Sequence, residues 1–395
     1  MQYRNDRHGE PLSLLGFGCM RFKRAAGPGG AIDYPAAQRQ IMRAIELGVN
    51  YFDTAYIYPG SEELLGRVLQ ENGVRDRVNI ATKLPQYLIR SASAIDRYFD
   101  EELRRLRTDH VDYYLMHMLT DVKTWQRLCD LGILSWLEEK KKSGQIRQVG
   151  FSYHGNSDMF CRLLDVYDWD FCQIQNNYLD ENSQAGITGL HKAAEKGLPV
   201  VIMEPLRGGR LTNGLPHSAR KVMDHAEVRR TPAQWAFDWL WDQKEVTCVL
   251  SGMNSLEMVR ENLETADKSF PGMLTEADRA ILVRVVSAIN ENMKVGCTGC
   301  RYCMPCPRGV DIPGIFAAYN RRASDGYFKS LTEYFMITGV RKDYTGPANC
   351  IGCGKCEQHC PQHLPIRQEL KSAQKAMEGL PYKLGKLVLP HIMHY

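Results

Sequence analysis

Eight short apolar runs constrain the fold of this 395-residue chain more than any other feature of its sequence. Each run is rich in β-branched or aromatic residues, and segments with helical periodicity separate the runs. They span residues 14–18, 49–53, 78–83, 111–117, 146–152, 171–175, 199–203 and 246–251. Strict alternation of strands and helices favours parallel strands with helical crossovers. Eight such units, with no GxGxxG fingerprint after the first strand, predict a closed α/β barrel of the (β/α)8 type rather than an open doubly wound sheet.

The chain beyond these eight units is rich in cysteine. Eight of the 13 cysteines lie between Cys297 and Cys360. A segment with helical periodicity, residues 275–294, runs directly into the first of them. We therefore expect a domain boundary near residue 290, with the barrel over residues 1–290 and a smaller domain over residues 291–395.

Composition restricts the cellular compartments and the kinds of partner that we expect for this protein. The amino terminus is charged, and no apolar run approaches the roughly 18 residues that a membrane span needs. The balance of 50 Lys and Arg against 46 Asp and Glu, a net charge of +4, is too weak to indicate a nucleic-acid partner. We expect a soluble cytoplasmic protein without nucleic acid or membrane span. Disulfides rarely persist in a reducing compartment, so the clustered cysteines indicate metal or cluster ligands.

The clustered cysteines form two groups of four, and each group ends in Cys-Pro. The second group has the C-x2-C-x2-C-x3-C-P spacing with which bacterial ferredoxins bind [4Fe-4S] clusters. The first group has one residue fewer before its last cysteine. In two-cluster proteins the fourth cysteine of a run ligates the other cluster, and the shorter spacing leaves open whether Cys306 does so. The groups are Cys297, Cys300, Cys303 and Cys306, and Cys350, Cys353, Cys356 and Cys360.

Zinc is the alternative for these eight thiolates, because zinc sites with four cysteine ligands also use C-x2-C pairs. Zinc sites usually combine two such pairs, whereas each group here has three cysteines in tandem before the terminal Cys-Pro. The spacing favours two [4Fe-4S] clusters, with one cluster as the fallback, in a small, mainly helical, ferredoxin-like domain. The other five cysteines have no ligand spacing and are predicted to be core residues: Cys19, Cys129, Cys161, Cys172 and Cys248.

Ionisable side chains stand at the ends of three consecutive predicted strands, where barrel enzymes place their working groups. Asp53 ends the second run and Tyr58 follows in the loop, while Lys83 and His117 end the third and fourth runs. Singly, they are as easily a helix cap, a loop aromatic, a surface charge and a core histidine. Together, on consecutive strand ends, they favour a catalytic site.

The motifs DTAYIY, ATK and LMH that contain these residues resemble the catalytic set of the aldo-keto reductase family. The resemblance extends through GFS, QIQ, MEPL and VRENL over most of residues 10–265. With its cysteine-rich addition the chain resembles the iron-sulfur-containing branch of that family. The resemblance implies NAD(P)H-dependent reduction of a small-molecule carbonyl, an aldehyde or ketone, to an alcohol.

Elementary chemistry gives each of the four residues a role in such a reduction. A phenol has a pKa of about 10 and is a poor proton donor at neutral pH unless a nearby charge lowers that pKa. The Lys83 ammonium would lower it, and Asp53 would orient Lys83 through a salt bridge. Tyr58 would then be the general acid. His117 would either fix the carbonyl oxygen or relay the proton, and the sequence leaves both roles open.

The resemblance also implies which residues bind the cofactor. Ser152 and Gln173 would contact the nicotinamide amide, and the loop from Leu206 to Arg210, with Gly208, would pass over the pyrophosphate. The turn Gly252–Ser255, with Asn254, would open a helix whose N–H groups suit an anion. Glu261 and Asn262 match adenine-side contacts. Met258 and Gly252 stand where the family often has Arg and Lys on the 2′-phosphate, so NADP(H) and NAD(H) both stay open.

The two predicted halves handle electrons differently. Iron-sulfur clusters pass one electron at a time, whereas a nicotinamide donates a hydride, and a bound flavin would reconcile the two. We favour a carbonyl reductase with auxiliary clusters. The alternatives are a redox enzyme in which the clusters exchange electrons with the barrel site through a flavin or a redox partner protein, and a barrel that serves only as a cofactor-sensing or interaction module.

Overall fold

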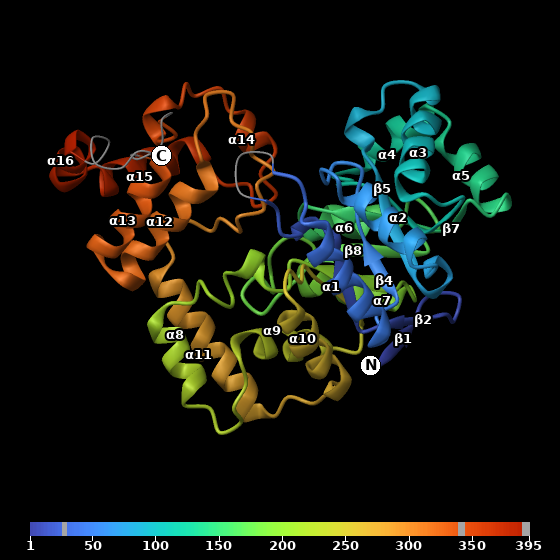
Figure 1. Cartoon of the computed structure of the whole chain (residues 1–395), viewed down its shortest axis with the longest axis horizontal. Coiled ribbons are helices and arrows are strands. Elements are labelled where there is room, and N and C mark those ends of the chain that lie inside the picture. Colours follow the sequence, from blue (N-terminus) through green and yellow to red (C-terminus); the bar gives the residue numbers. More distant parts are fainter. Residues whose placement is uncertain (26–29, 339–343, 389–395) are drawn as a thin grey trace. The chain divides into compact units, whose positions relative to one another are not determined.

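The structure, a computed structural model, describes residues 1–25, 30–338 and 344–388 and contains a closed barrel of eight parallel strands (Figure 1). The strands follow one another around the barrel in the order β10-β3-β4-β5-β6-β7-β8-β9. They are β3 (Leu15–Gly18), β4 (Tyr51–Asp53), β5 (Asn79–Leu84), β6 (Val111–Met116), β7 (Ile146–Tyr153), β8 (Phe171–Gln175), β9 (Val200–Met203) and β10 (Val246–Ser251). Each predicted run overlaps one of these strands, which confirms the (β/α)8 prediction.

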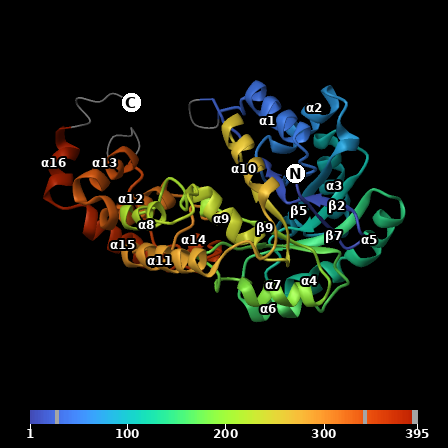
Figure 2. The ribbon, with the colours of Figure 1, turned by 90° about the horizontal axis from the view of Figure 1, so that it is seen from below.

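Helices lie outside the strands, as Figures 1 and 2 show. They are α1 (Tyr34–Glu46), α2 (Ser61–Glu71), α3 (Ala92–Leu106), α4 (Val122–Asp130), α5 (Ile133–Lys142), α6 (Ser157–Leu163), α7 (Gly186–Glu195), α9 (Pro232–Trp241) and α10 (Leu256–Lys268). In α3, for example, Ile95, Phe99, Leu103 and Leu106 are buried at helical spacing. Burying such an apolar stripe against the sheet holds each helix on the barrel.

A short hairpin that the sequence analysis did not predict precedes the barrel. Its strands, β1 (Tyr3–Asn5) and β2 (Pro11–Ser13), pair antiparallel. Leu12 of β2 belongs to the same buried apolar cluster as Tyr51, Tyr113 and Phe171, which stand near the beginnings of their strands. The hairpin therefore closes the amino-terminal end of the barrel.

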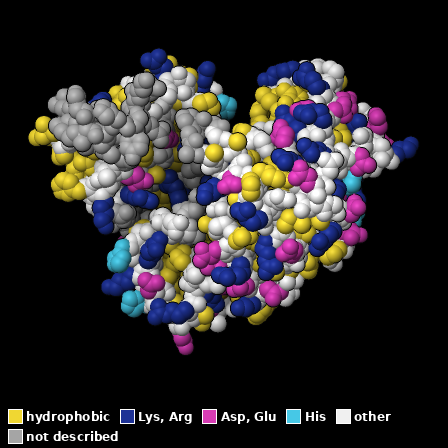
Figure 3. Space-filling view, viewed as in Figure 1, with side chains coloured by type: hydrophobic (Ala, Val, Ile, Leu, Met, Phe, Trp, Pro, Cys, Tyr) yellow, Lys and Arg dark blue, Asp and Glu magenta, His cyan; other side chains and the backbone are white. Residues whose placement is uncertain are grey.

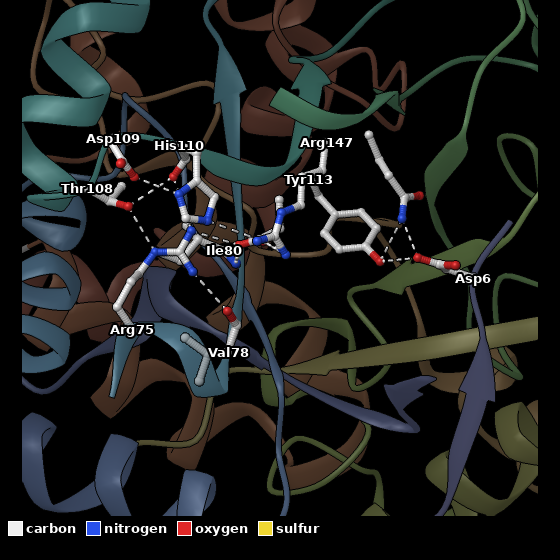
Figure 4. A network of polar contacts seen from close by, with 11 residues as sticks. Asp6, Arg75, Val78, Ile80, Thr108, Asp109, His110, Tyr113 and Arg147 are labelled. Carbon is white, nitrogen blue, oxygen red and sulfur yellow. Dashed lines mark hydrogen bonds and ion pairs between the residues drawn. The ribbon is translucent and has the colours of Figure 1, made fainter. Parts of the chain in front are cut away.

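A network of charged side chains around the buried Asp112 lies at this same end and is drawn in Figure 4. Asp112, near the start of β6, is 1% exposed. Its Oδ2 accepts hydrogen bonds from Arg75 Nη2 at 2.9 Å and from Ile80 N at 2.8 Å. Its Oδ1 lies 2.9 Å from Arg147 Nη1. Arg75 also donates to the carbonyl oxygens of Val78 and His110. The ion pair of Arg75 with Asp112 therefore connects the loops that lead into β5 and β6.

A cavity of about 570 Å³ adjoins this network and is lined by charged and polar residues, among them Asp6, Arg75, Asp112 and Arg147. It lies at the amino-terminal ends of the strands, and Tyr113 of the same lining donates to Asp6 of the hairpin at 2.7 Å. Barrel enzymes work at the opposite end, and residues at this end mainly support stability. We therefore treat the Asp112 network as structural.

The chain packs into two compact units that do not follow the order of the sequence. One unit comprises Met1–Pro205 and Ala233–Leu274, and the other comprises Leu206–Pro232 and Thr275–Tyr395. The segment that directly follows β9 thus packs with the carboxy-terminal region. The second unit takes up the chain again at Thr275, whereas the sequence analysis expects a domain boundary near residue 290. That boundary stays a prediction.

The second unit is mainly helical, as predicted. Its helices are α8 (His217–Asp224), α11 (Glu276–Asn292), α12 (Ile312–Asp325), α13 (Tyr327–Thr338), α14 (Lys355–Gln358), α15 (Ile366–Met377) and α16 (Leu380–Val388). Helices α8 and α11 lie side by side (Figure 1). Its core contains Ile315, Phe316, Tyr334, Ile366 and Leu370, and cysteines of both groups pack against that core. This unit therefore surrounds the predicted cluster ligands.

The visible surface carries basic and acidic side chains interspersed with one another (Figure 3). This mixture agrees with the net charge of only +4. Over the described residues, no helix has the length and apolar character that crossing a membrane requires.

Candidate active site and cysteine site

A buried ion pair joins two of the predicted catalytic residues. Asp53 ends β4 and Lys83 lies near the end of the neighbouring β5, and both side chains are almost fully buried. Lys83 Nζ donates to Asp53 Oδ2 at 2.6 Å and to the backbone oxygen of Thr54 at 2.6 Å. Burial raises the pKa of Asp53, while the charge and hydrogen bond of Lys83 oppose that shift. The sheet thus fixes one ammonium group in an apolar surrounding.

Tyr58 lies in the loop between β4 and α2, beside this ammonium. Lys83 Nζ is 5.2 Å from the centre of the Tyr58 ring. The loop is tied down on both sides, because Tyr58 N donates to Ala55 O at 2.9 Å and Ser61 N donates to Tyr58 O at 3.0 Å. Arg105 of α3 also donates to the Tyr56 carbonyl at 3.2 Å. The phenol is therefore held next to Lys83 by local backbone structure.

His117 completes the group. It directly follows β6, and its ring stands at 87° to the Tyr58 ring with a centroid distance of 6.2 Å. Its Nδ1 atom is buried without a hydrogen-bond partner among the described residues. Burial lowers the pKa of His117 well below 6.5, and the nearby Lys83 and His154 lower it further. The structure thus brings Asp53, Tyr58, Lys83 and His117 together, with a neutral imidazole at neutral pH.

The lowered pKa of His117 predicts a pH effect on stability. Unfolding below about pH 6.5 lets this ring take up a proton, so the stabilisation from its neutral form is complete above about pH 6.5 and is lost as the pH falls. We expect His117→Gln to lose less thermal stability than the parent protein between about pH 7 and about pH 5. The measurement is the melting temperature by tryptophan fluorescence. His191→Gln, at an exposed position of α7, is the control. Equal losses in all three proteins would contradict the prediction.

Two further residues at this end of the barrel were not identified from the sequence. The Tyr87 ring lies 6.2 Å from the His117 ring, and burial raises the pKa of Tyr87 to about 12. His154 follows β7, is buried, and has its Nδ1 3.0 Å from Gln184 Oε1. His154 is a polar residue just after a strand end, so the rule that found His117 could also have found it. Tyr87 gives no such signal, because it lies in a short 3-10 helix, Gln86–Leu88, beyond the end of β5.

Ser152 and Gln173, the residues expected at the nicotinamide, stand side by side. They are register partners in β7 and β8 and are both buried. Gln173 Nε2 lies 3.4 Å from Asp53 Oδ2, and its Oε1 has no partner among the described residues. Ser152 Oγ accepts from Met118 N at 2.9 Å. A buried acceptor without a donor is costly, and the amide N–H of a carboxamide would satisfy it, so these residues fit a nicotinamide.

The loop expected at the pyrophosphate belongs to the other compact unit. Leu206 precedes the turn Arg207–Gly209, in which Gly208 has a φ of 67° that favours glycine. Arg207 is 5% exposed, and its Nη2 donates to Gly296 O at 3.1 Å. This loop is therefore fixed to the residues just before Cys297. Its predicted role at the pyrophosphate stays a prediction.

The residues expected at an anion and at the adenine side of the cofactor lie in the turn after β10 and in α10. Gly252, Asn254 and Glu261 are exposed, whereas Asn262 is buried and donates to Ser251 Oγ at 3.1 Å. A Cβ atom at Gly252 would lie 3.2 Å from Arg21 Cβ. Arg21 is exposed and was not identified from the sequence, which gives no sign that residues so far apart are neighbours. Arg21 is a basic residue beside Gly252, the position where the family often has a Lys.

Cysteines from both groups meet in the second unit. Cys297, Cys300, Cys303 and Cys360 line one small cavity together with Ile312 and Phe316. Burial raises the pKa of Cys303 to about 12, and the thiols of Cys297, Cys300 and Cys360 act in the same direction. Cys360, the last cysteine of the second group, thus lies with three cysteines of the first group. This is the arrangement in two-cluster proteins, where the fourth cysteine of a run ligates the other cluster.

The arrangement of these cysteines bears on the choice between zinc and an iron-sulfur cluster. Within residues 1–25, 30–338 and 344–388, no three His, Cys, Asp or Glu side chains converge so as to hold one metal ion. Zinc needs its four ligands around one ion, whereas a cube spreads four thiolates over four iron corners. Cys297, Cys300, Cys303 and Cys360 line one cavity together, and four cysteines around a cavity are the ligands that such a cube needs.

The five cysteines outside the two groups are buried or partly buried. Cys19, Cys172 and Cys248 are buried, and Cys129 and Cys161 are intermediate. Burial raises the pKa of all five thiols. None of them is an exposed, activated thiol.

Two family models match the chain in separate regions. The model of the Aldo/keto reductase family matches residues 14–277, and the model of the 4Fe-4S dicluster domain matches residues 296–364. The first match covers the barrel, including all four residues of the candidate active site. The second covers both cysteine groups.

Curated proteins and solved structures agree with the first match. L-galactose dehydrogenase of Arabidopsis thaliana is 27% identical over 65% of this chain and 84% of its own length. NADH-specific methylglyoxal reductase of Escherichia coli is 24% identical over 70% of this chain and 96% of its own. A structure of aldo-keto reductase from Klebsiella pneumoniae in complex with NADPH is 25% identical, with a TM-score of 0.58, over 72% of this chain and 96% of that chain. With its barrel, its strand-end residues and a family model matching well over half of its length, the chain belongs to the aldo/keto reductase family.

Proposed function

We propose that this protein reduces a small aldehyde or ketone to an alcohol with NAD(P)H, and that Tyr58 is the general acid. One observation supports this most directly. Lys83 Nζ is held 2.6 Å from Asp53 Oδ2 and 5.2 Å from the centre of the Tyr58 ring. A buried ammonium beside a phenol stabilises the phenolate and so makes the phenol a better proton donor.

Reduced nicotinamide, when bound, would supply a hydride to the carbonyl carbon. Tyr58 would donate its proton to the carbonyl oxygen as negative charge develops there. Lys83 would stabilise the phenolate that remains, and Asp53 would hold Lys83 in place. The neutral His117 would donate a hydrogen bond to the same oxygen, which favours the positioning role over a relay through a charged imidazole. Ser152 and Gln173 would orient the carboxamide.

We further propose that the second unit binds two [4Fe-4S] clusters. Cys297, Cys300, Cys303 and Cys360 would hold one, as their shared cavity supports. By reciprocal exchange, Cys306 would join Cys350, Cys353 and Cys356 for the other. Eight cysteines at cluster-ligand spacing also support a reducing compartment, the cytoplasm, as the place of action.

The test of the proposed activity follows the hydride itself. The full chain, purified without oxygen and assayed for iron and acid-labile sulfide, is incubated with an aldehyde and NADPH or NADH deuterated at the nicotinamide C4 position. We expect deuterium on the carbinol carbon of the product and iron and sulfide for two clusters. Absence of deuterium with every carbonyl tried would contradict carbonyl reduction, and a colourless zinc-loaded protein would contradict the clusters.

Arg21 gives a prediction about the cofactor. Its position beside Gly252 suits contact with a cofactor phosphate, and a hydrogen bond to a charged group contributes about 1.5–3 kcal/mol. We expect Arg21→Ser to raise the Kd of NADPH about tenfold, measured by quenching of protein fluorescence. Lys23→Ser, the loss of an exposed charge nearby in sequence, should change the Kd little. Equal effects of both substitutions would assign the change to net charge alone.

One observation supports the alternative in which electrons also enter through the clusters. Of the eight grouped cysteines only Cys353 is exposed, and Ile351 beside it is 65% exposed. A one-electron donor could reach a cluster held there. If two electrons from reduced viologen, with two protons from solvent, convert an aldehyde to its alcohol without nicotinamide, this alternative is correct. If reduced viologen supports no turnover, the clusters are auxiliary.

A further inference from the structure

The Arg210 side chain lies against the loop of the first cysteine group. It follows the turn Arg207–Gly209 within the second unit. A Cβ atom at Gly299 would lie 3.7 Å from Arg210 Nε and 3.9 Å from Arg210 Nη2. Gly299 lies between Cys297 and Cys300 with a φ of +74°, which favours glycine, and the guanidinium is within ordinary contact distance of this turn.

Among residues 1–25, 30–338 and 344–388, this guanidinium has no acidic partner of its own. Burial is the largest influence on the pKa of Arg210 and lowers it, while Cys297 opposes that shift. Glu333 also acts on Arg210, but it already pairs with Arg321 at 3.0 Å. Across the described part of the chain, no carboxylate forms an ion pair with Arg210. A partly buried cation without a counter-ion is unfavourable, which indicates that an anion belongs beside it.

Arg210 is also held in place. Arg207, three residues earlier, is 5% exposed and donates to Gly296 O at 3.1 Å. That hydrogen bond fixes the loop to the residue before Cys297. The backbone that carries Arg210 is thus held close to the first cysteine group. The four thiolates lining the cavity beside this loop would supply the missing negative charge.

We propose that Arg210 is the electrostatic partner of the cluster held by Cys297, Cys300, Cys303 and Cys360, and that its positive charge raises the reduction potential of that cluster. Each reduction adds one electron, and hence one negative charge, without making or breaking a bond. A fixed nearby cation stabilises the more negative state, and charge near the sulfurs is among the factors that set cluster potentials. This inference rests on the proposed function only in requiring that the clusters are bound.

The test is an anaerobic redox titration of the full chain, with viologens as electron donors and EPR as the readout. We expect Arg210→Gln to lower the equilibrium constant for reduction of one cluster about tenfold or more, which is about 59 mV for one electron. The other cluster should keep its potential. Cys353→Ser, which removes a ligand of the other cluster, assigns the two EPR signals.

Two further variants keep the result decisive. Arg210→Lys retains the charge and should retain most of the potential. Arg301→Gln removes an arginine that lines the same cavity but is 58% exposed, and screening should make its shift small. A potential lowered equally by Arg210→Lys and Arg210→Gln, or unchanged in Arg210→Gln, would overturn the proposal.

Loss of a cluster would also be informative. If Arg210→Gln purifies with half of the iron and Arg210→Lys with all of it, the positive charge is needed to hold the anionic cluster, which supports the proposal. If both variants lose the same iron, the charge is not the cause and the proposal fails. Absence of iron and sulfide from the parent protein would instead refute the proposed function.

Discussion

Replacing Tyr58 by Phe is expected to lower kcat for NAD(P)H-dependent aldehyde reduction by about 10²–10⁴-fold, the contribution usual for a positioned general acid. The substitution removes only the phenol oxygen. The backbone hydrogen bonds that hold residue 58, Tyr58 N to Ala55 O and Ser61 N to Tyr58 O, do not involve the side chain. The loop should therefore keep its shape and the cofactor its Kd. Single-turnover measurement of nicotinamide oxidation would isolate the chemical step.

Tyr56→Phe is the matched control in the same loop. The Tyr56 ring stacks on the Arg105 guanidinium at 4.1 Å and meets the Tyr98 ring at 4.8 Å, and neither contact needs the hydroxyl. We expect near-parent kcat in this variant. Full activity in Tyr58→Phe, or an equal loss in Tyr56→Phe, would remove the Tyr58 phenol from the proposed mechanism.

Asp112→Ala is expected to lower the free energy of unfolding of the barrel unit by about 3–5 kcal/mol, as when one partner of a buried ion pair is removed. The change would leave Arg75, with its side chain 17% exposed, without a counter-ion at the entrance to β6. It would also leave Ile80 N without its acceptor. Because this network lies at the amino-terminal ends of the strands, the cofactor Kd of the folded protein should change little.

Urea unfolding followed by tryptophan fluorescence measures this effect cleanly. All six tryptophans lie in the segments that form the barrel unit, so the signal reports on that unit alone. Asp109→Ala is the control, because Asp109 also pairs with His110 in this network but its side chain is 95% exposed (Figure 4). Exposed ion pairs contribute little, so the control should unfold like the parent. An equally stable Asp112→Ala would show that the network does not hold the barrel closed.

Local patterns predicted the barrel strands, and they also pointed to side chains that the structure brings close together, for a physical reason. A strand buried on both faces is mostly apolar, as in residues 246–251, where all six residues are buried and four are apolar, and this leaves a signal in the sequence. The closed parallel barrel then places successive strand ends together, so Asp53 and Lys83 could be expected to meet before any distance was known. Whether each residue has its proposed role needs the experiments above.

Features that depend on long-range contacts were not predictable in this way. The strands of the hairpin Tyr3–Asn5 and Pro11–Ser13 have three residues each, too few to show a period. Arg21 and Gly252, or Arg210 and Gly299, are distant in sequence and become neighbours only through the fold. Sequence patterns report on local periodicity and chemistry, whereas these pairs arise from packing.

The segment between β9 and α9, residues 206–232, packs with the second unit, and this limits where the chain can be truncated. A shortened product ending after α10 would still include residues 206–232, but it would lack α11, against which α8 packs. Ala219 and Met223, both buried in the intact molecule, would then face water. The carboxy-terminal region is therefore not an independent module. Recombination or engineering that exchanges it between relatives must also exchange residues 206–232, which follow β9.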